Sequence, residues 1–151
     1  MLDTKQEIRE LISSYVDEHK DELIRKVQEA VQIRSIIGEE QDIQKFMKKL
    51  YEDIGLKVVE VQPDLAKLSK HEAYVDSGFP LEDRTNIIGI WKGSDKGRSL
   101  TLHGHIDVVS EEPIEMWTRD PLGGEIEGNK LYGRGSYDMK SGVIANWFAL
   151  K

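Results

Sequence analysis

The chain of 151 residues contains no cysteine, so disulfide bonds and thiolate metal sites are both excluded. It also lacks any apolar run near the ~20 residues that a membrane-spanning helix needs. Residues 1–7 do not show the basic-then-apolar order of a signal peptide. We therefore expect a cytoplasmic protein with no membrane partner.

Clusters of basic residues are missing as well. The chain has 21 Lys and Arg against 28 Asp and Glu, a formal net charge of −7, which argues against binding to nucleic acid or to an anionic membrane. No internal repeat or low-complexity segment is present. The length fits one domain with a modest core.

Apolar residues recur at helical spacing in the first third of the chain. Thr4 and Glu7 form a capping box ahead of a stripe that runs to Val31, as one bent helix or two. A second stripe predicts a helix over 43–54, closed by Gly55. A third helix is expected over 139–150.

The rest of the chain alternates in the manner of strands and loops. We expect strands over 56–61, 84–91 and 98–106, the last of them central, and a hairpin over 125–132. Residues 62–83 are expected to form a long irregular connection, and residues 92–97 a tight turn. This order of elements predicts the α/β class.

Two histidines lie at the end of the expected central strand. The period-2 pattern places His105 and Asp107 on one face. There the carboxylate can accept a hydrogen bond from one ring nitrogen and leave the other nitrogen free for a metal. The alternative is a polar strand end in which His105 simply pairs with Asp107.

A second motif follows at residues 132–140. Gly133 and Gly135 permit a turn with positive φ, and Asp138 comes just before the third expected helix. Asp138 is then either the N-cap of that helix or a carboxylate that bridges two divalent cations.

These motifs carry a resemblance. Residues 85–88, 104–109, 117–121 and 131–140 together resemble the acetylornithine deacetylase, succinyl-diaminopimelate desuccinylase, aminoacylase and carboxypeptidase family of co-catalytic zinc hydrolases. The resemblance implies the N-terminal part of a three-layer α/β/α catalytic domain. It also implies hydrolysis of the amide bond in N-acyl amino acids or dipeptides by metal-activated water.

The resemblance assigns roles to three residues. His105 would bind one zinc ion, Asp138 would bridge two zinc ions, and Asp107 would act as the catalytic carboxylate that steadies the imidazole. Cobalt or manganese could replace zinc. The resemblance also implies a cis peptide bond between Asp138 and Met139.

Other parts of the family's machinery lie outside the sequence. The family places a Glu-Glu pair, another acidic ligand and a late histidine further on, so residues 1–151 are expected to be the N-terminal portion of the catalytic domain. The C-terminal catalytic half and a lid or dimerisation domain would be absent. We expect an inactive, truncated fragment of a dinuclear zinc amidohydrolase.

The alternative belongs to another class. The chain would be a non-catalytic binding or assembly module that keeps the family's first half and pairs through the edge of its sheet. In either case we expect self-association, because the third helix is expected to expose Val143, Ile144, Trp147 and Phe148.

Overall fold

A computed structural model describes residues 4–76, 78–94 and 96–151 of the chain. Five positions within the segments named in the sequence predictions therefore lie outside the described residues: the N-terminal residues 1–3, Ser77 in the irregular connection and Asp95 in the tight turn. The elements are α1 (Lys5–Gln32), α2 (Gln41–Asp53), β1 (Lys57–Val61), α3 (Leu65–Leu68), β2 (Asn86–Ile90), β3 (Ile126–Glu127), β4 (Lys130–Leu131) and α4 (Ser141–Phe148). A 3₁₀ turn at Ile114–Met116 and a kinked helical turn at Ser136–Lys140 complete them.

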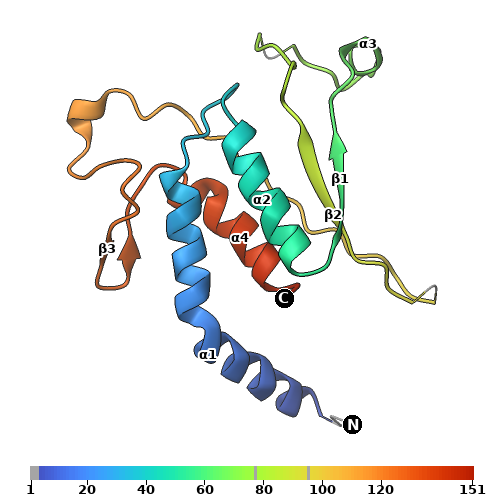
Figure 1. The fold of residues 1–151 in the computed structure, drawn as a ribbon, viewed down its shortest axis with the longest axis vertical. Coiled ribbons are helices and arrows are strands. Elements are labelled where there is room, and N and C mark those ends of the chain that lie inside the picture. Colours follow the sequence, from blue (N-terminus) through green and yellow to red (C-terminus); the bar gives the residue numbers. More distant parts are fainter. Residues whose placement is uncertain (1–3, 77, 95) are drawn as a thin grey trace.

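The long helix α1 begins at the predicted capping box. The Thr4 hydroxyl accepts from the Glu7 amide at 3.2 Å, and the Glu7 carboxylate accepts from the Thr4 amide at 3.0 Å. The sequence predicted either one bent helix or two helices here. The structure has one helix, which is continuous to Gln32. Its first half projects away from the rest of the molecule (Figure 1).

The core lies between α1, α2 and α4. Helix α4 packs beside α1 and α2, and β1 and β2 lie on the far side of α2 (Figure 1). The core contains the buried residues Ala30, Ile43, Met47, Leu50, Val143, Ile144, Trp147 and Phe148. The expectation that the last four would be exposed is wrong, because α1 and α2 cover them; their exposed fractions are 5%, 0%, 3% and 7%.

Two small antiparallel sheets accompany the helices. Strands β1 and β2 pair with Val59 opposite Ile88, and β3 and β4 form the predicted hairpin with Ile126 opposite Leu131. The molecule is thus of the α/β class. The predicted irregular connection also contains the short helix α3.

The expected central strand over 98–106 does not form. Within the described part of the chain, these residues are extended but pair with no strand, and Leu100 is 81% exposed. A strand needs a neighbour for its amides and carbonyls, and the nearest ladder contact is a single bridge between Ile36 and Val108.

None of the helices in the described ranges combines the length and the apolar character needed to cross a membrane.

Candidate metal centre

The imidazole of His105 stands at the end of the extended segment 98–107. Its Nδ1 lies 2.9 Å from the backbone carbonyl of Asp107 and 3.5 Å from Oδ1 of the same residue. The hydrogen-bond partner behind the ring is thus the Asp107 carbonyl, and the carboxylate contributes mainly its charge. The His105 side chain is 45% exposed.

The carboxylate of Asp138 faces the other ring nitrogen. Its Oδ1 lies 3.0 Å from Nε2 of His105, so the two predicted metal ligands, which come from different motifs, meet at one place. Asp138 is not the N-cap of α4, since that helix starts at Ser141 and Lys140 holds the cap position. The peptide bond between Asp138 and Met139 is cis, as the resemblance implied.

Glycine shapes the turn that presents Asp138. Gly135 has φ +76°, and a Cβ built on it would lie 2.5 Å from Cγ1 of Val108. The Lys140 amide then closes the turn with a 2.9 Å hydrogen bond to the Gly135 carbonyl. A residue with a side chain at this position would meet both unfavourable φ and a buried methyl group.

The surroundings of His105 favour its protonated form. Partial burial lowers its pKa, but the hydrogen bonds to the Asp107 carbonyl and the Asp138 carboxylate, with the charges of both aspartates, raise it, and the net shift is upward. Each ring nitrogen faces an acceptor oxygen. The imidazole therefore either carries a proton on both nitrogens, or carries a proton on one nitrogen and binds a cation with the other.

These donors fit part of a zinc site. A neutral imidazole whose Nδ1–H bonds a carbonyl leaves Nε2 free for a metal, and a carboxylate 3.0 Å from Nε2 can share that metal. A catalytic zinc generally needs three protein ligands. The residues that the structure describes contain no group of three or more His, Cys, Asp or Glu side chains arranged to hold a metal.

A groove of about 240 Å³ adjoins His105 and Asp107. Arg84 lies in its wall and donates from Nε and Nη2 to Oε1 of Glu40, at 3.1 and 2.8 Å. Oε2 of Glu40 is buried with no hydrogen-bond partner. Gln44, Thr85, Asn86 and His103 also line this groove, so its walls are mainly polar beside the imidazole.

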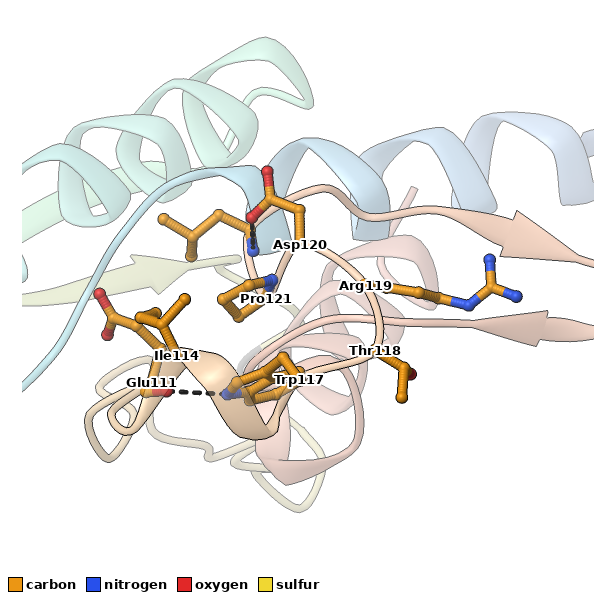
Figure 2. A pocket seen from close by; sticks show the side chains of 8 residues that line it. Glu111, Ile114, Trp117, Thr118, Arg119, Asp120 and Pro121 are labelled. Carbon is orange, nitrogen blue, oxygen red and sulfur yellow. Dashed lines mark hydrogen bonds between the residues drawn. The ribbon is translucent and has the colours of Figure 1, made fainter.

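A second hollow, of about 540 Å³, lies on the loop between the two motifs (Figure 2). Trp117, in this loop, packs against neighbouring residues of its own domain. Its indole N–H donates to the Glu111 carbonyl at 2.8 Å, and the Arg134 guanidinium lies 4.9 Å from its ring centre.

Two residues that sequence reasoning missed hold the motifs in place. The ammonium of Lys140, 1% exposed, donates to the carbonyls of Ala30 and Ile33 at 2.9 and 2.6 Å. Burial lowers the pKa of Lys140 to about 8. The hydroxyl of Ser35, 0% exposed, donates to the Ile106 carbonyl at 2.7 Å. A single Lys and a single Ser carry no periodic signal that could have indicated these contacts.

Known proteins resemble the same part of the chain. Residues 101–151 match the family model of peptidase family M20/M25/M40. "Succinyl-diaminopimelate desuccinylase 2" of Ruegeria sp. (strain TM1040) is 50% identical over 60 residues, which are 40% of this chain and 15% of that protein. The "Succinyl-diaminopimelate desuccinylase" of Polynucleobacter necessarius subsp. necessarius (strain STIR1) is 41% identical over 83 residues, 54% of this chain and 22% of that protein.

A third relative agrees with these two. The "Succinyl-diaminopimelate desuccinylase" of Rhodospirillum centenum (strain ATCC 51521 / SW) is 53% identical over 51 residues, 34% of this chain and 13% of that protein. The chain thus spans less than a quarter of the length of these curated relatives. The predicted resemblance is confirmed: residues 101–151 are similar to peptidase family M20/M25/M40.

Proposed function

We propose that this chain supplies the N-terminal part of the catalytic domain of a dinuclear metal-dependent amidohydrolase. The observation that carries the proposal is the 3.0 Å approach of His105 Nε2 to Asp138 Oδ1, between side chains from separate motifs. Both side chains are open to solvent, at 45% and 78% exposed, so a cation and a substrate could reach them. The full domain would be the three-layer α/β/α form expected from the sequence.

Each residue then has a definite task. The Asp107 carbonyl accepts a hydrogen bond from Nδ1–H of His105 and so fixes the tautomer that presents Nε2. Asp138 has two carboxylate oxygens and can serve two cations, whereas His105 serves one. Zinc ions held there would polarise an amide carbonyl and provide hydroxide near neutral pH.

The described residues give only part of this machinery. Since they contain no cluster of three or more possible ligands, we propose that the 151 residues by themselves do not hydrolyse amides. Further ligands and a general base would come from other polypeptide. The substrate we propose is an N-acyl amino acid or a dipeptide, N-succinyl compounds among them, in agreement with the names of the relatives. We also propose that the protein acts in the cytoplasm.

The test is equilibrium zinc binding to the purified chain, followed by an assay with N-acetyl and N-succinyl amino acids. We expect binding that His105→Ala and Asp138→Ala abolish and that the matched control variants His71→Ala and Asp53→Ala retain. Equal binding by all five proteins would contradict the proposal. Turnover by the chain alone would contradict its proposed dependence on further residues.

The extended segment 98–107 favours the second candidate, an assembly module. Leu100 is 81% exposed, and Trp91, directly after β2, is 68% exposed, so both present apolar side chains to water. We propose that copies of the chain self-associate there through unpaired backbone. This role is compatible with the first proposal, because neither Leu100 nor Trp91 lines the groove beside His105.

A further inference from the structure

The two halves of the candidate metal centre share one support, the α1–α2 connection (residues 33–40). On the His105 side, the Ser35 hydroxyl donates to the Ile106 carbonyl at 2.7 Å, and the Val108 amide donates to the Ser35 carbonyl at 2.9 Å. These two bonds bracket the residues that follow His105. The segment that carries the imidazole has no strand pairing among the described residues. These two hydrogen bonds to Ser35 fix its end instead.

On the Asp138 side, Lys140 makes the corresponding link. Its ammonium donates at 2.6 Å to the carbonyl of Ile33, the first residue of the same connection, and at 2.9 Å to Ala30 in the last turn of α1. Carbonyls at a helix C-terminus lack intrahelical partners and carry partial negative charge, so a buried ammonium suits them. Lys140 stands two residues after Asp138.

Both supports are rigid by burial. Ser35 and Lys140 are 0% and 1% exposed, and Val31, in the last turn of α1, is 0% exposed. A shift of the α1–α2 connection would therefore move both motifs. Loss of either Ser35 or Lys140 as a support would let one motif change its position relative to the other. Metal ligands need placement to about half an ångström, which usually depends on such partners behind them.

We infer that Lys140 and Ser35 are positioning residues that set the distance between His105 and Asp138 through the α1–α2 connection. The inference rests on the proposed function, because that distance matters only if a cation is held there. Lys140 does not touch the cation. It acts through the backbone that carries Asp138, as Ser35 acts through the backbone that carries His105.

The experiment compares the full chain with Lys140→Met, Ser35→Ala and a matched control, Trp147→Phe. Trp147 is 3% exposed and donates to the Leu50 carbonyl at 2.9 Å, so its variant also loses a buried hydrogen bond, but one that joins α4 to α2 and involves neither motif. Urea unfolding without metal ranks the three variants by stability. Zinc affinity and the imidazole ¹⁵N signals of His105, assigned with His105→Ala, then report the site itself.

We expect Lys140→Met and Ser35→Ala each to weaken zinc binding about 10- to 100-fold. In the metal-free chain they should move the His105 signals toward those of Asp138→Asn, which lacks the carboxylate, while Trp147→Phe leaves affinity and signals unchanged. The inference is overturned if neither variant changes affinity or signals more than Trp147→Phe does. If the unsubstituted chain binds no zinc, the proposed function fails, and movement of the His105 signals in both variants still supports the positioning role.

Discussion

Arg34 donates from Nε to Oε1 of Glu111 across 2.5 Å, and so joins the α1–α2 connection to the loop between the two motifs. Arg34 also donates to Glu39, so one guanidinium serves two carboxylates. The hydrogen bond from Arg34 holds the pKa of Glu111 below its usual value of 4.5. A carboxyl group with a lowered pKa in the folded state stabilises the fold above its unfolded pKa and loses that contribution as the pH falls.

The first prediction concerns acid stability. Glu111→Gln should unfold with a smaller dependence on pH below 4.5, because the amide has no charge to lose there. At pH 7 the variant should be less stable than the unsubstituted chain. Urea midpoints measured from pH 7 down to pH 3 test both statements. Parallel pH curves for the two proteins would refute the first, and equal midpoints at pH 7 would refute the second.

The second prediction concerns the turn before Asp138. Gly135→Ala should destabilise the chain by about 1–3 kcal/mol more than Gly128→Ala does, because of overpacking. Both glycines have positive φ, +76° and +58°, but only the Cβ at position 135 meets Val108, while that at 128 meets nothing within 4 Å. Denaturant unfolding of the two variants isolates the steric contribution. Equal losses would mean that the backbone angle alone explains the glycines.

The third prediction tests the burial of α4. Ile144→Ala should cost about 2–5 kcal/mol, the usual cost of truncating a fully buried isoleucine. Ile126→Ala should change stability far less, since Ile126 is 46% exposed and Ile144 is 0% exposed. Thermal or urea unfolding measures both. Similar small effects at the two sites would show that α4 is not part of the core.

The fourth prediction tests self-association. Leu100→Lys should lower the weight-average mass in sedimentation at micromolar concentration, because it places charge on the proposed contact surface. Val75→Lys is the matched control, since Val75 is 83% exposed and Leu100 is 81% exposed, but Val75 lies in the 62–83 connection. A monomeric unsubstituted chain, or identical masses for both variants, would contradict the prediction.

The sequence allowed the local elements to be predicted well. The capping box of α1, the apolar stripe of α2, Gly55 after it and the β3–β4 hairpin all follow from patterns within a few neighbouring residues. His105 and Asp138 were selected by their motifs, and the structure brings them to 3.0 Å. The roles predicted for them and for Asp107 stay predictions.

The failures concern contacts between distant parts of the chain. The alternation at 98–106 predicted a strand, yet a strand also requires a partner, which periodicity cannot supply. Val143 and Trp147 were expected to be exposed, yet α1 and α2 cover α4. Lys140 was missed because a buried lysine is rare and its acceptors, Ala30 and Ile33, lie more than a hundred positions away in sequence.

The extended segment that carries His105 has a consequence for unfolding. Within the described residues, no backbone amide of 98–107 donates a hydrogen bond, whereas Asp138 adjoins a helix packed in the core. Segments with few protected amides open at a lower free energy than core helices. Heat or denaturant should therefore separate His105 from Asp138 before α1, α2 and α4 come apart. Loss of the candidate centre and loss of the fold are two events, with fast amide exchange around His105 marking the first.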